Sequence, residues 1–191
     1  MTTLASTWLF QDRSKEQIAF FSEYLRRYPR DCAAYRERAT GLWYADQLHD
    51  AVDEYSRAID LDPTDLLSRS GRGQVLAELG ESARAIEDLD IALRIAEAAP
   101  KPDASWRNWC KHVEAFARRG RGVALATSGQ IPLAMKEFDA SITLSPDDAW
   151  VYLSRAALYE RIGDVDRALI DYRTSLEKTA PPLTPLQKER A

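Results

Sequence analysis

The chain has 191 residues, 45% of them hydrophobic, which is typical of one folded domain or one short solenoid and excludes a chain that is disordered throughout. Lysine and arginine number 26 against 30 aspartates and glutamates, so the net charge of -4 provides no overall positive field to attract nucleic acid. No run approaches the roughly 20 apolar residues that cross a bilayer, and residues 1–10 lack the basic start of a secretion signal, so we expect a soluble cytoplasmic protein with no membrane partner.

A repeat of 34 residues organises the sequence. Pro63 follows Pro29 by 34 residues, and four full units are predicted at 32–65, 66–99, 115–148 and 149–182. Three positions of every unit are small, namely the eighth (Ala39, Gly73, Gly122, Ala156), the twentieth (Ala51, Ala85, Ala134, Ala168) and the twenty-seventh (Ala58, Ala92, Ser141, Ser175). Small residues let two helices approach closely, and the large residues at the eleventh and twenty-fourth positions fill the space between them. Each unit is therefore predicted to be a pair of antiparallel helices.

Residues 1–31 form a truncated unit before these four. We expect the end of a first helix at residues 3–10 and a second helix from about Ser14 to Arg27. Later helices are predicted to begin after Asp31, Asp65 and Asp148, because an aspartate side chain accepts hydrogen bonds from the free amides of a helix start. The turns inside three units are expected at glycines, namely Gly80, Gly129 and Gly163.

The period is interrupted once, between the second and third full units. Glu97 and Pro146 hold equivalent places but are 49 residues apart, which exceeds one repeat by 15. Pro100 and Pro102 are expected to end one helix, and Asp103 to cap the next. The insertion at about 100–114 is therefore predicted to lengthen the following helix to about 103–128, or roughly 39 Å. At the other end, 183–191 is expected to be a short tail or a capping turn.

These small and large positions resemble the tetratricopeptide repeat family. The resemblance implies an all-α, right-handed α-solenoid of antiparallel helix pairs with no strands, forming a single domain over 1–182. It also implies a non-catalytic function in which the first helices line a concave groove that holds a peptide or protein. The second, fifth, ninth and twelfth positions of the units would face the partner, which gives Arg36, Thr40, Trp43, Ser70, Gln74, Phe116, Arg119, Val123, Trp150 and Leu153.

Charged residues recur at two further positions. Every full unit has arginine at its seventh position and an acid at its twenty-third, which gives Arg38 and Glu54, Arg72 and Asp88, Arg121 and Glu137, and Arg155 and Asp171. Since the two positions lie on opposite helices of a pair, we predict a ladder of ion pairs within or between units. In Arg-Arg-Gly-Arg-Gly, residues 118–122, most positions are internal to the repeat, so only Arg119 is expected to be free to face a ligand.

Trp106 and Trp109 in the insertion admit two interpretations. They can pack on the helix before them, near Ile91, Ile95 and Ala98, or form a second exposed patch that contacts a partner or another copy. The main functional prediction is a cytoplasmic adaptor that binds protein through its groove. The alternative is a structural protein that forms a homodimer or larger homo-oligomer through this patch or through an open carboxyl end.

The sequence offers no motif for catalysis. It has two histidines, His49 and His112, and no phosphate loop, strained serine elbow or cluster of metal ligands. The two cysteines, Cys32 and Cys110, match no metal or redox spacing. We therefore expect no enzyme activity, no cofactor and no metal.

Overall fold

The computed structural model describes the backbone of residues 2–99 and 103–179 and the side chains of 13–99 and 103–178. Within these residues the chain is helical throughout, with short turns and no strand. The helices are α1 (Thr2–Arg27), α2 (Cys32–Tyr44), α3 (Leu48–Leu61), α4 (Leu66–Glu78), α5 (Ser82–Ala98), α6 (Ala104–Thr127), α7 (Ile131–Leu144), α8 (Ala149–Arg161) and α9 (Val165–Thr179). The all-α helical-repeat fold predicted from the sequence is confirmed.

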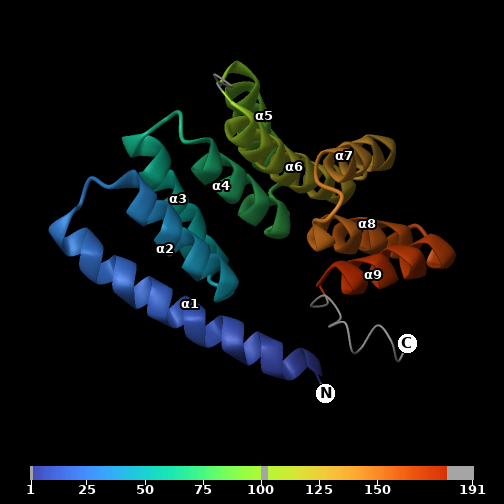
Figure 1. The fold of residues 1–191 in the computed structure, drawn as a ribbon, viewed down its shortest axis with the longest axis horizontal. Helices are drawn as coiled ribbons and strands as arrows, with labels where there is room; N and C mark the ends of the chain where they lie inside the picture. Colours follow the sequence, from blue (N-terminus) through green and yellow to red (C-terminus); the bar gives the residue numbers. More distant parts are fainter. Residues whose placement is uncertain (1, 100–102, 180–191) are drawn as a thin grey trace.

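Consecutive helices pack in pairs, and the pairs stack into an arc (Figure 1). The pairs are α2 with α3, α4 with α5, α6 with α7, and α8 with α9, and α1 packs against α2. The first helices of successive pairs also touch, since α2 contacts α4, α4 contacts α6, and α6 contacts α8. These four helices form one continuous inner row, which is the surface on which the predicted groove residues lie.

The truncated unit differs from its prediction. We expected the end of one helix, a turn and a second helix, but α1 is a single helix from Thr2 to Arg27. No glycine or proline stands between residues 2 and 27, so nothing in the local chemistry ends a helix there. Only one helix therefore precedes α2 among the described residues. It packs where the second helix of a preceding repeat unit would lie.

Helix starts follow the predicted aspartates. Asp31, Asp65 and Asp148 accept hydrogen bonds from Ala34 N, Leu67 N and Trp150 N at 3.1, 3.1 and 3.0 Å. Asp103 caps α6 in the same way, with its Oδ1 2.8 Å from Trp106 N.

The helix α6 has 24 residues, about twice the length of α4 at 13. Residues 104–108 at its start are exposed, as expected for a helix that projects beyond its neighbours. Residues 100–102 and the predicted tail at 183–191 lie outside the described part of the chain.

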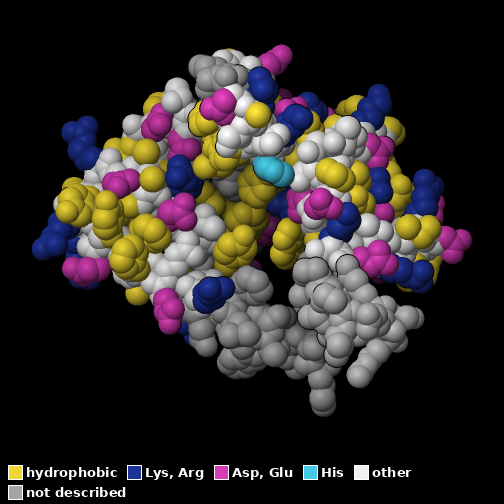
Figure 2. Space-filling model, in the orientation of Figure 1, with side chains coloured by type: hydrophobic (Ala, Val, Ile, Leu, Met, Phe, Trp, Pro, Cys, Tyr) yellow, Lys and Arg dark blue, Asp and Glu magenta, His cyan; other side chains and the backbone are white. Residues whose placement is uncertain are grey.

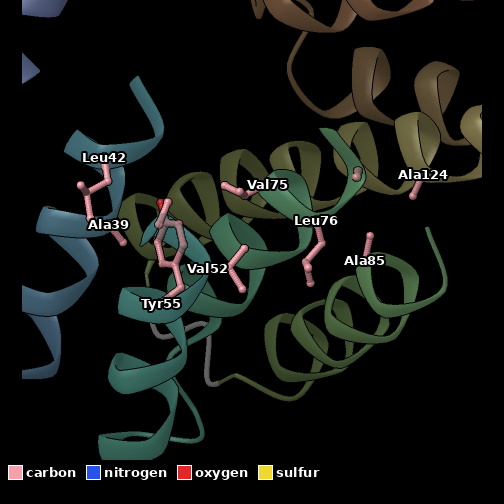
Figure 3. Packing of buried hydrophobic residues seen from close by; sticks show 10 residues of the cluster. Ala39, Leu42, Val52, Tyr55, Val75, Leu76, Ala85 and Ala124 are labelled. Atoms are coloured by element: carbon pink, nitrogen blue, oxygen red, sulfur yellow. The ribbon is translucent and has the colours of Figure 1, made fainter. Parts of the chain in front are cut away.

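The large twenty-fourth residue of a unit is held between two first helices. Tyr55 of α3 is 2% exposed and lies between Ala39 of α2 and Val75 of α4 (Figure 3). A Cβ added at Gly71 would lie 2.5 Å from the Tyr55 ring, and one at Gly120 would lie 3.4 Å from Leu89, the equivalent residue of the next unit. Glycine at the sixth position thus leaves the space that the large twenty-fourth residue of the preceding unit fills. This role of the sixth position was not predicted from the sequence.

Each seventh-position arginine joins its own helix to two others. Each lies against the acid at position 23 of its own unit: Arg38 Nε to Glu54 at 2.7 Å, Arg72 Nε to Asp88 at 2.6 Å, Arg121 NH1 to Glu137 at 3.1 Å and Arg155 Nε to Asp171 at 2.7 Å. Each also reaches position 25 of the preceding helix pair: Ser22 at 3.4 Å, Ser56 at 2.9 Å, Asp90 at 2.9 Å and Asp139 at 2.7 Å. The ladder therefore runs both within units and between them. We call these four arginines and their partners the arginine clamps.

Replacing Asp88 by leucine tests how much one clamp stabilises the stack. Asp88 is 4% exposed and contacts both Arg72 and Arg69, so its loss leaves two arginines without a carboxylate. We expect the free energy of unfolding to fall by about 3 kcal/mol, because breaking a buried ion pair leaves an unpaired charge. The exposed pair of Glu23 and Arg26 provides the control, and Glu23→Gln should cost less than about 1 kcal/mol. Urea denaturation measures both, and equal losses would contradict a structural role for the clamp.

The turn after α2 contains the one non-glycine residue with positive φ in the described chain. Asp46 has φ of 61°, whereas Gly80, Gly129 and Gly163 occupy the turns of the other units at 80°, 81° and 81°. Because a side chain crowds the backbone in this left-handed conformation, Asp46→Gly should raise the free energy of unfolding by about 1 kcal/mol. Gly80→Ala should lower it by a similar amount. A destabilised Asp46→Gly variant in urea denaturation would mean that the aspartate makes a compensating interaction.

Candidate functional site

A cavity of about 200 Å³ lies on the inner row where residues of all four full units meet. Figure 2 shows hydrophobic side chains around a hollow near the centre of this face. Residues of α2, α4, α6 and α8, with the cap residue before α8, line the cavity: Trp43, Tyr44, Gln74, Phe116, Arg119, Val123, Asp148, Trp150 and Ser154. Six of them were predicted to face a partner. We call this space the central cavity.

Aromatic rings form much of its wall. The Trp43 ring lies edge-on to Phe116, with centroids 6.4 Å apart, and therefore bridges α2 and α6. Its indole N–H donates to Glu78 Oε2 at 2.9 Å, which fixes the ring against α4. Desolvation raises the pKa of the Glu78 carboxyl, and the hydrogen bond from Trp43 opposes that shift. On the other side, Trp150 is 58% exposed, so it offers a large apolar surface to a partner.

Arg119 differs from the prediction that it is free. It is only 8% exposed, with one NH2 donating to Gln74 Oε1 at 2.8 Å and its guanidinium 5.1 Å from the centroid of the Phe116 ring. Desolvation lowers its pKa, and Asp148, Tyr44 and Glu78 oppose that shift through their charges. The guanidinium is thus part of the cavity wall rather than an extended surface cation.

Three other predicted groove residues lie apart from this cavity. Ser70 is 0% exposed, so the prediction that it contacts a partner is wrong; α4 packs too closely against its neighbours at this position. The Thr40 hydroxyl is 3.0 Å from the Tyr55 hydroxyl and 3.0 Å from Arg36 O. Arg36 donates to Asp65 at 2.6 Å, which places it at the edge of the stack near the insertion. The side chains of Thr40 and Arg36 are thus occupied by hydrogen bonds within the chain, whereas Ser70 is enclosed by packing and its hydroxyl has no hydrogen-bond partner among the described residues.

The groove continues from the central cavity into a second cavity of about 430 Å³. The two share Val123 and Ser154, and the second is mostly apolar, with Phe138, Leu153 and Leu158 among its walls. Leu153, predicted to face a partner, is 39% exposed. Together the two cavities provide a continuous surface along α6 and α8.

The thirteenth position of every unit was missed. Tyr44 lines the central cavity, Glu78 holds Trp43, and Thr127 and Arg161 line the second cavity. The signal was present, because position 13 lies four residues after position 9 and therefore on the same side of the helix. The family register that was applied named position 12 and did not extend to position 13.

Trp106 and Trp109 lie near the start of α6 and line neither cavity of the groove. Their rings stack with centroids 4.8 Å apart, Trp106 is 38% exposed, and Trp109 is half-buried. They line a cavity of about 580 Å³ together with Ile95, Ala98 and Arg36. The pair therefore borders the preceding helix, as the first interpretation expected, and Trp106 still presents surface. Contact of this surface with a partner or another copy stays a prediction.

The described residues show no group of three or more metal-ligating side chains, and none of their helices is long and apolar enough to cross a membrane. His49 is exposed in the first turn of α3, and His112 is exposed with its Nδ1 3.4 Å from Ser145 Oγ. These histidines lie on different helices and form no site with the groove.

Comparison with known proteins identifies the repeats. Residues 36–100 match the family model described as tetratricopeptide repeat. This segment of the chain contains tetratricopeptide repeats. The chain is similar to human tetratricopeptide repeat protein 6, with 27% identity over 57% of this chain, and it spans 18% of that relative's length.

Solved structures agree on the fold. A tetratricopeptide repeat protein from Parabacteroides merdae has a TM-score of 0.68 at 20% identity, covering 90% of this chain and 61% of that one. The structure of the APC/C hetero-tetramer Cut9–Hcn1 has a TM-score of 0.69 at 15% identity, covering 86% of this chain and 29% of that one. Tetratricopeptide repeats of this kind indicate a protein-interaction or scaffold module, in a fold that is generally non-catalytic.

Alanine substitutions at the two stacked tryptophans separate packing from exposure. Trp109→Ala should lower the free energy of unfolding by about 2 kcal/mol, since the half-buried indole leaves a gap beside α5. Trp106→Ala, at the more exposed ring, should cost about 1 kcal/mol or less. Thermal and urea unfolding followed by circular dichroism check both. Equal, negligible losses would instead favour a patch that serves only a partner.

Proposed function

We propose that this chain is a non-catalytic cytoplasmic adaptor that binds a peptide or protein segment in the groove formed by the central and second cavities. The observation that carries the proposal is the junction of four units at one cavity with a largely exposed Trp150. Tryptophan is among the residues that most often dominate binding energy, above all where neighbouring side chains exclude water. Both cysteines are free, which suits a reducing compartment.

The likeness to the Cut9–Hcn1 assembly supports a protein as the partner. That structure is named as a complex of two proteins, and its helical-repeat chain shares this fold. Neither the fold nor the similarity to that structure identifies the partner of this chain, so a binding selection must find it.

A selection from a displayed library of random dodecapeptides tests the groove. The wild type should enrich a family of sequences. Synthetic copies of these should bind the double variant Trp150→Ala, Leu153→Ala about tenfold more weakly or worse, because it removes two large, exposed apolar side chains of the groove. The matched control is Leu169→Ala, Ile170→Ala on α9, where the residues are 59% and 62% exposed. Equal binding by both double variants would place the site elsewhere.

A homo-oligomer formed through the carboxyl-terminal pair is the second candidate. Ile162, Val165, Leu169 and Ile170 are 47–62% exposed, which is unusual for large apolar side chains at the end of a solenoid. Sedimentation over a wide concentration range distinguishes the candidates, since an adaptor should stay at 21.6 kDa. If the mass rises with concentration and Leu169→Glu, Ile170→Glu restores the monomer, the second candidate is favoured.

A further inference from the structure

Arg119 is the one buried or half-buried arginine of the inner row that contacts no carboxylate among the described residues. The others are paired, Arg36 with Asp65, Arg38 with Glu54, Arg69 and Arg72 with Asp88, Arg118 with Glu114, Arg121 with Glu137, and Arg155 with Asp171. Yet Arg119 is the most buried of them, at 8% exposed. A buried charge without a counter-ion is unfavourable, so its neighbours must hold it there for a reason other than stability.

The contacts of Arg119 leave part of its hydrogen-bonding capacity unused. One NH2 donates to Gln74, and the face of the guanidinium lies over Phe116. Its buried Nε has no hydrogen-bond partner among the described residues. Guanidinium has five donors in a planar fork, which suits a carboxylate with two oxygens.

The two nearby acids are held by other donors. Asp148 Oδ1 accepts from Trp150 N at the start of α8, and Glu78 Oε2 accepts from the Trp43 indole. They act on Arg119 only through space, and their charges do not overcome the desolvation that lowers its pKa. No other cation lines the central cavity among the described residues. Arg119 is therefore the group there that an incoming charge would meet.

We propose that Arg119 anchors the side-chain carboxylate of an aspartate or glutamate in the bound peptide, with a large apolar residue of the same peptide in the adjoining second cavity. This inference rests on the proposed function and names its ligand chemistry. An internal side chain is favoured over a chain end because the groove continues past Arg119, through Val123 and Ser154, into a cavity walled by Leu153, Leu158 and Phe138. The aromatic rings of Trp43 and Trp150 exclude water from the pair and so strengthen it.

The dodecapeptide selection supplies the probe, with peptides displayed between fusion partners so that neither end is free. Wild-type selections should enrich aspartate or glutamate at one fixed distance from a leucine, phenylalanine or similar residue. For the best synthetic, end-blocked peptide, replacing that acid by its amide should weaken binding by about ten- to hundredfold. This comparison uses the unaltered protein and does not depend on any variant folding.

Variants then assign the preference to Arg119. In Arg119→Met the acid and amide peptides should bind alike, and Arg119→Lys should retain part of the preference, because it keeps the charge without the planar fork. Arg94→Met, which removes an exposed arginine from the outer helix α5, should leave the preference unchanged. Thermal unfolding confirms that each variant is folded.

Four results would overturn the inference. Enriched peptides that lack an acid but depend on Trp150 and Leu153 would leave the proposed function standing and remove only the role of Arg119. A preference for acid that survives Arg119→Met would place the anion elsewhere. A peptide whose acid requirement is met equally by a free carboxyl terminus would show that a chain end is recognised. Absence of any enriched peptide counts against the groove and the inference together.

Discussion

The arginine at the seventh position of each unit joins three helices at one point. Arg72 on α4 holds Asp88 on α5 and Ser56 on α3, so a single planar group fixes both the pair to which it belongs and the pair before it. Hydrophobic packing alone allows neighbouring helices to slide and rotate, whereas two directed hydrogen bonds from a rigid fork restrict both motions. The same geometry recurs at Arg155, where Asp171 and Asp139 are the partners. The curvature of the inner row, and therefore the cavity where four units meet, depends on this repeated constraint.

The clamp also survives the insertion. Arg121 reaches Asp90 across the 15 extra residues, at the position equivalent to the Ser56 that Arg72 reaches. The insertion therefore lengthens α6 at its amino-terminal end without shifting the stacking of the helix pairs. What it changes is the surface beyond the clamp, where Trp106 and Trp109 extend the structure past its neighbours. The stacked repeats and the added surface are thus formed by different parts of the chain.

Much of the fold could be predicted because the residues that begin and end the helices recur at equivalent positions in several units. Asp31, Asp65 and Asp148 cap helices, and Gly80 has the positive φ that its turn requires. The α1 helix was mispredicted where the family register was applied without local support. The candidate site was harder to predict than the fold. The repeat register tells which side of a helix a residue occupies, but not how closely the next unit approaches, so the burial of Ser70 and Arg119 could not be predicted from spacing.

The surroundings of Arg119 explain how a buried arginine without a carboxylate partner is held in place. Gln74 uses both ends of its amide, donating to Phe116 O at 3.0 Å and accepting from Arg119 at 2.8 Å. A Cβ at Gly120 would lie 2.5 Å from the Gln74 side chain, so glycine there is what lets the amide lie against α6. The guanidinium is therefore oriented before any ligand arrives, and a partner would not have to order it. Each clamp arginine contacts a carboxylate, whereas Arg119 contacts none among the described residues. Its fixed orientation without a carboxylate partner is what supports the proposed role in binding.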